Sequence, residues 1–398
     1  PRFIWYVKRL SGNDTLANGA NAAGPYIPKE FLFSIFPALN RQDVKNPDVW
    51  FSLRVDSHSA DERKIRATWY NNKFHGNPTG GRNETRFTNL GGVSSALLDP
   101  DNTGALAVFT FKLEQEGIVE ASYVWVCRNA LEEDLIEDRI GQVNPGQWKV
   151  WAAEKSGHAD HFNSKEKPRL SCWLKPNEIP PAWLLKFPTG AEIIGKTIAL
   201  RPGNDMDTDT RLVKRRDCEY EIFRSVEEAI ELPSIKIGFN EIDEFVARAQ
   251  TILQRRKSRS GRSLELHARH IFIEEGMKED QDFSHQPESE SGKKPDFLFP
   301  SAEAYKDKNY PSASLRMLAA KTTCKDRWRQ IINEADRIPI KHLLTLQEGV
   351  SEGQFQEMSE AGVKLVVPAS LVSKFPEVVR PRLQTFGNFL KEAANIKK

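Results

Sequence analysis

Short segments of alternating apolar and polar residues dominate the first 150 positions of the chain. A period of two is typical of strands with one buried face, and it predicts strands at 3–9, 50–55, 65–70, 106–113 and 118–127. The stretch 99–104 combines proline, glycine and side chains that bond their own backbone, so it predicts a turn before the strand at 106–113. Because an open sheet of many short strands leaves unpaired edges, the pattern favours a closed or nearly closed barrel.

This alternation stops near residue 155. Between 156 and 181, histidine, asparagine and charged residues replace it, and four prolines interrupt regular structure at positions 168, 176, 180 and 181. Such a composition is typical of a linker. The sequence therefore predicts an amino-terminal domain at 1–155, a linker at 156–181 and a carboxy-terminal domain at 182–398.

Beyond the linker the apolar spacing lengthens to that of helices. Thr189 is expected to cap a helix that runs to residue 200, and a second helix is expected at 209–232. A third is expected to begin at Asn240. Its buried stripe is predicted to comprise Ile242, Phe245, Ala249 and Ile252.

The rest of the second half mixes strand-length and helix-length patterns. Short apolar runs occupy 296–299, 315–321, 342–346 and 365–367, and amphipathic stretches lie at 326–338, 353–361 and 381–394. Strands that alternate with helices predict a central mixed sheet flanked by helices, an α/β domain.

Composition adds the class of protein. With 398 residues, 39% hydrophobic and 28% charged, the chain is neither a low-complexity tail nor a small disulfide scaffold. No apolar run approaches the roughly 18 residues needed to cross a bilayer, so we expect a cytoplasmic protein with no membrane partner. The net charge of +2 hides 57 basic and 55 acidic residues, so local clusters matter more than the sum. The four cysteines, Cys127, Cys172, Cys218 and Cys324, lack paired spacing, so neither zinc nor structural disulfides are expected.

Two charged residues stand at the ends of apolar strands. Asp296 enters the strand at 296–299 and Lys321 leaves the strand at 315–321. If the two ends meet, they offer a carboxylate for a divalent cation beside an ammonium for a water or a phosphate. Strand ends also carry charges for solubility alone, and this pair by itself leaves that alternative open.

The segment after Lys321 adds a second carboxylate. On a helix through 326–336, Glu334 would lie at the margin of a buried stripe and could reach the same cation. Lys325, Asp326 and Arg327 would start this helix and project past the sheet end. Basic residues there suit guanine, and an aspartate suits cytosine, in a major groove.

Three strings around these residues resemble the EcoRII-type restriction endonucleases. They are KPDFLFPSA at 294–302, KTTCKDRWRQ at 321–330 and LLTLQEGVS at 343–351. KRLS at 8–11, NDT at 13–15, and DP at 99–100 with NTGAL at 102–106 resemble the amino-terminal domain of the same family. The resemblance therefore spans nearly the whole chain.

The resemblance implies a PD-(D/E)XK nuclease in the carboxy-terminal half and a DNA-binding β-pseudobarrel in the amino-terminal half. Asp296 would bind the metal, Mg²⁺, Lys321 would be the catalytic lysine, and Glu334 would supply the second carboxylate from the following helix. Glu265 is the candidate for a further catalytic glutamate from the preceding helix. A solvated helix residue remains the alternative for Glu265.

The family resemblance also implies the DNA sequence that is cut. Members cut 5′-CCWGG before the first cytosine, and Lys325, Asp326 and Arg327 match their base-reading segment. The family and its relatives turn the central base out of the helix, and Arg216 and Tyr220, one helical turn apart, have a fitting spacing. A tyrosine on a helix is more often a core residue, and that alternative stays open. Tyr305 matches a family tyrosine near the active site, without an assigned role.

Other basic residues are candidates for DNA contacts. The cluster RRKSRSGR at 255–262 is expected to join two helices and to lie along the phosphate backbone. Within 80–89, Arg82, Glu84 and Arg86 resemble the family's DNA-reading loop. Lys8, on the first strand, is a further candidate, and an exposed strand residue without that role is its alternative.

These features favour a homodimeric, Mg²⁺-dependent type II restriction endonuclease that acts on double-stranded DNA. Its amino-terminal domain would bind another copy of the site and control the nuclease, and the two-fold DNA site favours a two-fold protein. The alternative is a sequence-specific DNA-binding regulator that keeps a nuclease-like fold without cleavage. Asp296, Lys321 and Glu334 together argue against it, because a binding module needs no such trio.

Overall fold

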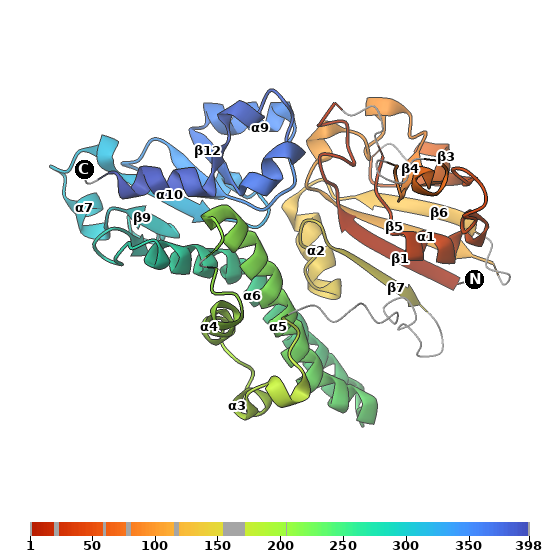
Figure 1. Ribbon diagram of the computed structural model, residues 1–398, viewed down its shortest axis with the longest axis horizontal. Helices are drawn as coiled ribbons and strands as arrows, with labels where there is room; N and C mark the ends of the chain where they lie inside the picture. The colour runs from red at the N-terminus through yellow and green to blue at the C-terminus, as the bar shows by residue number, and fades with distance from the viewer. Residues whose placement is uncertain are drawn as a thin grey trace.

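The computed structural model describes residues 2–19, 24–58, 61–76, 81–114, 119–153, 172–203 and 205–396. A β-rich amino-terminal half lies beside an α/β carboxy-terminal half, and two long helices, α5 (Thr208–Ile237) and α6 (Ile242–Glu274), project below their junction (Figure 1). Among the described residues, no helix is long and apolar enough to cross a membrane.

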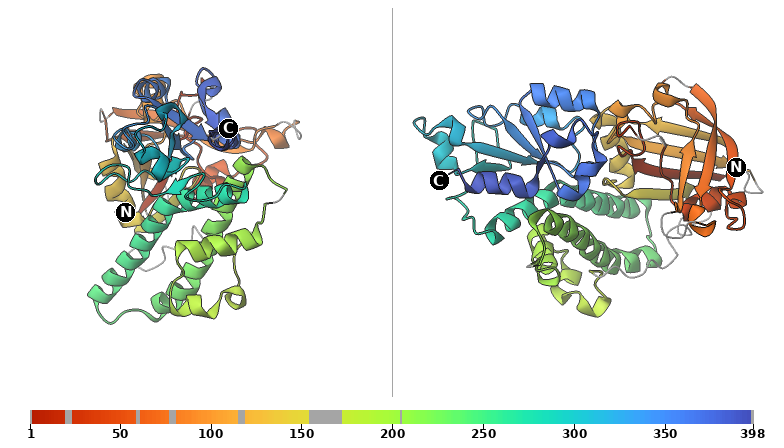
Figure 2. Two further views of the ribbon diagram at one scale, coloured as in Figure 1. Left: turned by 90° about the vertical axis from the view of Figure 1, so that its left-hand side faces the viewer. Right: turned by 45° about the horizontal axis from the view of Figure 1, so that its top comes forward.

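The amino-terminal half is built on one seven-stranded sheet that curls into a half-barrel (Figure 2). Its order is β4-β3-β2-β6-β5-β1-β7, so β4 and β7 form its two edges and the sheet does not close. All five predicted strands are present, and β4 and β7 are additions that the alternation did not indicate. The strands are β1 (Arg2–Arg9), β2 (Asp48–Val55), β3 (Asp61–Tyr70), β4 (Glu84–Thr88), β5 (Leu106–Leu113), β6 (Val119–Val126) and β7 (Trp148–Ala153).

Two helices cover opposite faces of this sheet. Helix α1 (Lys29–Ile35) packs Phe31 and Leu32 into the main core, which contains Phe109 and Phe111. Helix α2 (Ala130–Ile140) packs on the other face, against Val7 and its neighbours. The predicted turn at 99–104 is present as a short 3₁₀ helix, Pro100–Asn102, followed by Gly104 with a φ of +88°.

The carboxy-terminal half contains the expected mixed sheet. Its order is β13-β12-β11-β10-β9-β8, in which β10 to β13 are parallel and β8 and β9 are antiparallel to their neighbours. Helices α6 and α10 (Phe386–Ala394) cover one face, and α7 (Ala302–Lys306), α8 (Trp328–Ile331) and α9 (Glu352–Glu360) cover the other. The strands are β8 (Ser284–His285), β9 (Phe297–Phe299), β10 (Arg316–Ala320), β11 (Lys341–Leu344), β12 (Val363–Val367) and β13 (Gln384–Thr385).

The helices that precede this sheet follow the predicted order. Helix α4 (Gly190–Leu200) begins after Thr189, whose hydroxyl accepts from the Glu192 amide as expected of a cap. Helix α6 begins at Ile242, with Glu241 rather than Asn240 at its cap. Its predicted buried stripe is wrong, because Ile242 is 80% exposed and Phe245 is 52% exposed. The start of α6 extends beyond the sheet, and the helix buries its later residues instead.

The expected linker is described only in part. Residues 154–171 lie outside the described residues, whereas Cys172, Leu174 and Ile179 are buried against α5. A disulfide joins Cys172 to Cys218 on α5, so the expectation of no structural disulfide is wrong. The carboxy-terminal body therefore includes residues from Cys172 onward, and α3 (Pro181–Leu185) belongs to the same cluster.

Candidate active site and DNA interface

The ends of β9 and β10 bring Asp296 and Lys321 together. The two strands are antiparallel, with Phe297 opposite Leu318, so the residue before β9 and the residue after β10 lie at the same end of the sheet. The Lys321 ammonium lies 3.3 Å from Asp296 Oδ2, and the Ala320 amide donates to the same oxygen at 2.7 Å. The expected meeting of these two strand ends is therefore present in the structure.

Glu334 is the second carboxylate at this place. Burial raises its pKa to about 7, Lys321 opposes the rise, and the negative charge of Asp296 adds to it. Burial also raises the pKa of Asp296, against the effects of Lys321 and the Ala320 amide. The Lys321 ammonium thus lowers the pKa of both carboxyls, and the negative charge of Asp296 raises that of Glu334, so the three groups lie near one another.

This set of oxygen donors suits Mg²⁺. Among the described residues, no three acidic, histidine or cysteine side chains are arranged so that they could hold a metal ion together. Mg²⁺ does not need one, because proteins hold it through one or two carboxylates while water and phosphate oxygens complete its shell. Burial raises the pKa of both Asp296 and Glu334, so a cation near them would stabilise their charged forms.

The backbone that carries Glu334 differs from the expected helix. Helix α8 ends at Ile331, and Glu334 lies on the turn that follows, where its amide donates to the Ile331 carbonyl at 3.1 Å. Ala335 has a φ of +49°, which a helix does not allow. The predicted helix through 326–336 is therefore wrong, whereas Glu334 is still near enough to Lys321 and Asp296 for both to affect its pKa.

Glu265 approaches the site from α6 and is not a solvated helix residue. Its side chain is only 6% exposed, shares a 2.5 Å hydrogen bond with His285 Nε2, and accepts from Gln286 Nε2 at 2.7 Å. Its charge contributes to the raised pKa of Asp296, so the two carboxylates are neighbours. The structure thus excludes the solvated alternative and places a third acidic group beside the site.

The candidate base-reading segment lies against the amino-terminal half. Lys325 is buried, with its ammonium 3.5 Å from the Cys127 carbonyl, and Arg327 Nη2 lies 3.4 Å from Asp134 Oδ1 on α2. Asp326 pairs locally with Arg329 at 3.5 Å. Two of the three candidate base readers are therefore engaged by the other domain.

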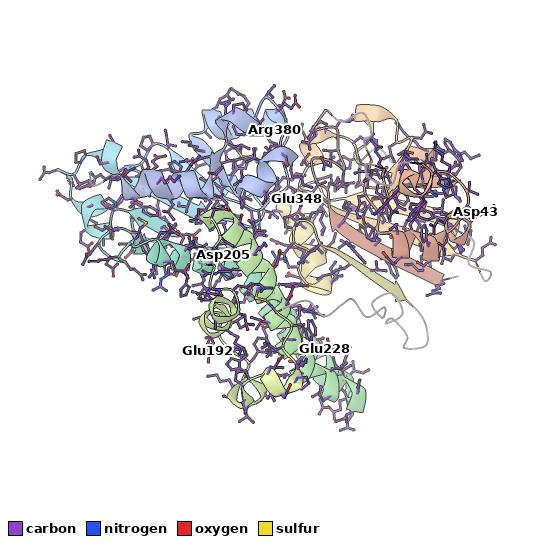
Figure 3. All side chains as sticks on the ribbon, in the orientation of Figure 1. Asp43, Glu192, Asp205, Glu228, Glu348 and Arg380 are labelled. Carbon is purple, nitrogen blue, oxygen red and sulfur yellow. A yellow bond between two sulfur atoms is a disulfide. The ribbon has the colours of Figure 1, made fainter. Side chains whose placement is uncertain are left out.

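Further contacts continue this junction on both sides. Lys257 on α6 pairs with Asp138 on α2 at 2.7 Å, and Gln354 Nε2 donates to the Asp101 carbonyl at 2.8 Å. The Gly12 amide donates to the carbonyl of Glu348, which Figure 3 labels at the boundary between the two halves. Helix α2 and the turn at 99–104 thus cover the part of the carboxy-terminal half from which Lys325 and Arg327 project.

Gln347 is a residue at this junction that sequence reasoning missed. Its Oε1 accepts from the amides of Cys324 and Lys325 at 2.9 and 3.1 Å, and its Nε2 donates to the Gly349 carbonyl. It therefore fixes the backbone of the candidate base-reading segment. The sequence feature that could have indicated Gln347 is its position inside the family-like string at 343–351.

Arg216 and Tyr220 lie on α5, where other residues cover them. Arg216 is 7% exposed, and burial lowers its pKa to about 10. The Arg259 guanidinium lies 5.0 Å from the centre of the Tyr220 ring and donates to Glu219 at 2.7 Å. In this arrangement an arginine lies against the ring that was expected to face a base.

The basic cluster at 255–262 is not an interhelical loop. It lies within α6, and three of its four arginines pair with glutamates of α5. The pairs are Arg255 with Glu231, Arg256 with Glu227, and Arg259 with Glu219. Each of these glutamates also pairs with a second arginine, Arg248, Arg224 or Arg216, so the three cluster arginines are held within the helix pair. The expected contact along a phosphate backbone stays a prediction.

The amino-terminal candidates differ in their exposure. Residues 84–88 form strand β4 rather than a loop. Arg82 is exposed near Tyr70, whereas Arg86 pairs with Glu84 at 3.3 Å and donates to the Gly24 carbonyl. Lys8 is buried in a 2.7 Å ion pair with Asp14, so the alternative of an exposed strand residue is wrong, and in this arrangement its ammonium is not available for DNA. Of these four side chains, Arg82 alone is exposed for DNA.

Comparison with known proteins gives consistent matches over both halves. Residues 1–155 match the model "Restriction endonuclease EcoRII, N-terminal", and residues 223–390 match "EcoRII C terminal". The chain is 44% identical to the type II restriction enzyme EcoRII of Escherichia coli, over 99% of this chain and 95% of that protein.

Two solved structures are similar to part of the chain. Metal-depleted Ecl18kI in complex with uncleaved, modified DNA matches with a TM-score of 0.43 and 18% identity, over 56% of this chain and 84% of that one. Its complex with uncleaved DNA matches with a TM-score of 0.40 and 20% identity, over 53% and 80%. On the two family models and the long match to the E. coli enzyme, the chain belongs to the EcoRII family of type II restriction endonucleases.

Proposed function

We propose that the chain is a Mg²⁺-dependent endonuclease that hydrolyses double-stranded DNA at 5′-CCWGG, before the first cytosine. The observation that carries the proposal is the meeting of Asp296, Lys321 and Glu334 at one end of the β9–β10 pair. An ammonium 3.3 Å from Asp296 Oδ2 and near enough to Glu334 to lower its pKa, in an EcoRII-family chain, supports a PD-(D/E)XK arrangement.

Each residue has a defined task in this proposal. Asp296 and Glu334 would hold Mg²⁺, which when bound lowers the pKa of a water molecule and stabilises charge on the phosphate. Lys321 Nζ orients the attacking water opposite the leaving oxygen and offers a positive charge to the developing charge on the phosphate. The Ala320 amide fixes Asp296 Oδ2, and Glu265 adds negative charge near Asp296.

Sequence recognition is assigned to Lys325, Asp326 and Arg327. They stand next to Lys321 along the chain, so contacts with the inner bases would be close to the reacting phosphate. A bidentate contact of arginine with guanine contributes about 1–3 kcal/mol of discrimination. Arg216 and Tyr220 are proposed to hold a base turned out of the helix, which requires Arg259 to leave the Tyr220 ring.

Arg327→Ala is expected to weaken binding to a CCWGG duplex by about 10- to 100-fold, with little change for a duplex without the site. Fluorescence anisotropy with both duplexes, in Ca²⁺ so that no cleavage occurs, measures the difference. Asp134→Ala is the matched control, because it removes the same 3.4 Å ion pair and leaves the arginine in place. Equal losses on both duplexes would remove Arg327 from base reading.

The contacts of α2 support control of the nuclease by the amino-terminal domain. Lys325 and Arg327 cannot read bases while they contact the Cys127 carbonyl and Asp134. We infer that a second copy of the site, bound by the amino-terminal domain, releases this contact. Arg82 is the candidate that is exposed for that DNA, and Glu84 and Arg86 would join it if their mutual ion pair opens.

We infer a homodimer that assembles through the tip of the α5–α6 hairpin. This tip carries exposed apolar side chains, whereas soluble monomers rarely expose contiguous apolar patches. A two-fold DNA site also requires two nuclease centres. The exposed side chains are Ile235, Ile237, Ile242, Phe245 and Val246.

Ile242→Glu combined with Phe245→Glu is expected to convert the dimer into a monomer in light scattering after gel filtration. The monomer is then expected to nick one strand instead of cutting both. Leu185→Glu on α3, where the leucine is 91% exposed, is the control for adding charge to an apolar surface. An unchanged dimer mass in the double variant would place the interface elsewhere.

A further inference from the structure

The turn that carries Glu334 has a backbone conformation that it does not favour by itself. Ala335 is a residue with a Cβ at a φ of +49°, in the left-handed region. Such residues persist where the surrounding structure determines them, and they gather at functional sites. The position of Glu334 therefore depends on whatever holds residues 334–338.

The Lys341 side chain forms hydrogen bonds with the backbone of this turn. Lys341 is the first residue of β11, is 5% exposed, and donates from Nζ to the carbonyls of Ala335 and Ile338 at 2.7 and 2.5 Å. These two bonds span the left-handed residue and the end of the turn. The same ammonium is near enough to Glu334 to oppose the rise in the pKa of that carboxyl.

The Glu290 carboxylate also fixes the backbone of this turn, through the residues that follow Ala335. Its Oε1 accepts from the Asp336 amide at 3.1 Å and from the Tyr305 hydroxyl. The Tyr305 oxygen in turn accepts from the Arg337 amide at 3.2 Å. Two consecutive amides after Ala335 are thus fixed by one carboxylate and the phenol that it orients.

We propose that Glu290 and Lys341 are positioning residues for Glu334 and so set the affinity of the nuclease site for its divalent cation. This inference rests on the proposed function, because it takes Glu334 as a metal-binding carboxylate. Neither residue needs to touch DNA or the cation. Groups that orient metal-binding side chains commonly change metal affinity or activity about 10- to 100-fold when they are replaced.

A positioning role predicts that replacing either residue weakens metal binding and leaves DNA binding nearly unchanged. Loss of the Glu290 or Lys341 side chain lets the turn at 334–338 relax, which moves the Glu334 carboxylate relative to Asp296. The Mg²⁺ concentration that gives half-maximal cleavage is then expected to rise about 10- to 100-fold, with much of the rate restored at saturating Mg²⁺. DNA affinity without metal is expected to stay within about twofold, because the base-reading segment is fixed by Gln347 instead.

The test compares Glu290→Ala, Glu290→Gln and Lys341→Met in the full-length chain. Glutamine keeps an oxygen that can accept from the Asp336 amide, so Glu290→Gln is expected to lie nearer to the wild type than Glu290→Ala. Glu288→Ala, an exposed glutamate on the same segment, and Lys364→Met on β12 are the matched controls. The measurements are Mg²⁺ dependence of cleavage, Mn²⁺ binding by electron paramagnetic resonance on the DNA complex, and hydrogen exchange of the Asp336 and Arg337 amides.

Weaker Mn²⁺ binding together with faster exchange of these two amides, in Glu290→Ala and Lys341→Met but not in the controls, supports the proposal. A wild type that cuts and binds Mn²⁺, with both variants equal to it in Mg²⁺ dependence and Mn²⁺ affinity, overturns the positioning role and leaves the nuclease proposal standing. A wild type that neither cuts nor binds Mn²⁺ overturns both. If Lys341→Met fails to fold, the pair of Glu290 variants decides, because Glu290 is only partly buried.

Discussion

Lys321→Ala is expected to reduce the rate of DNA cleavage by about 10²- to 10⁴-fold while leaving DNA binding intact. The ammonium is the group that orients the water and offsets charge at the phosphate, and no other described lysine lies within ion-pair distance of Asp296. The side chain is 26% exposed, so its loss leaves no buried cavity that would unfold the chain. Single-turnover cleavage of a CCWGG duplex at saturating protein and Mg²⁺ measures the chemical step.

Lys308→Ala, which removes an exposed lysine away from the site, is the matched control. Anisotropy with the same duplex in Ca²⁺ separates binding from cleavage. Cleavage by Lys321→Ala within about threefold of the wild-type rate, well inside the loss expected for a group that acts in proton transfer, would exclude Lys321 from the chemistry. Loss of binding equal to the loss of rate would make it a DNA-binding residue instead.

Removal of the amino-terminal domain is expected to speed cleavage of DNA that carries a single site by about 5- to 150-fold, the usual range of coupling between sites. Without α2, Lys325 and Arg327 lose their contacts with Cys127 and Asp134 and are available for bases. The shortened chain must begin before Cys172, because this residue and those that follow it pack on α5. Initial rates on a one-site plasmid, with and without added site-bearing duplex, measure the effect.

A full-length chain with Asp134→Ala and Asp138→Ala tests the same idea without removing a domain. These changes break the ion pairs of α2 with Arg327 and Lys257. The double variant is expected to lie between the wild type and the shortened chain. If neither protein is faster than the wild type on one-site DNA, the amino-terminal domain does not restrain the nuclease.

The parts of the fold and site that the sequence predicts are those set by local periodicity. Alternation placed five of the seven strands in the first sheet, and the same logic brought Asp296 and Lys321 to one sheet end. A strand's direction fixes where its flanking residue lies, so two apolar runs were enough. By contrast, the short strands β4 and β7 carry too little alternation to be distinguished from loops.

The errors arise where distant residues decide the structure. The arginines at 255–259 looked free because their partners, Glu219, Glu227 and Glu231, lie 24 to 40 residues earlier on another helix. These glutamates repeat at helical spacing, which is a signal that complementary stripes on paired helices can give. Cys172 and Cys218 are 46 residues apart and carry no such signal.

For Glu334, one feature was set by local spacing and another by distant residues. The apolar stripe of Trp328 and Ile331 predicted that Glu334 lies near the sheet end, where Lys321 and Asp296 affect its pKa, whereas the helix itself stops at Ile331. The turn that replaces it is held by Glu290 and Lys341, which come from two other segments. Local spacing therefore predicted the neighbourhood of Glu334 and missed the contacts that hold its turn.

The central claim is that Asp296, Lys321 and Glu334 form a Mg²⁺-dependent centre for DNA hydrolysis at a fixed sequence. Its most direct test incubates the purified full-length chain with a plasmid of known sequence that has several CCWGG sites, with Mg²⁺ or with EDTA, and maps the cleaved ends. The account predicts new 5′ ends before the first cytosine of CCWGG on both strands, and none in EDTA. Ends at unrelated sequences, equal cleavage in EDTA, or an intact plasmid even with added site-bearing duplex would contradict it.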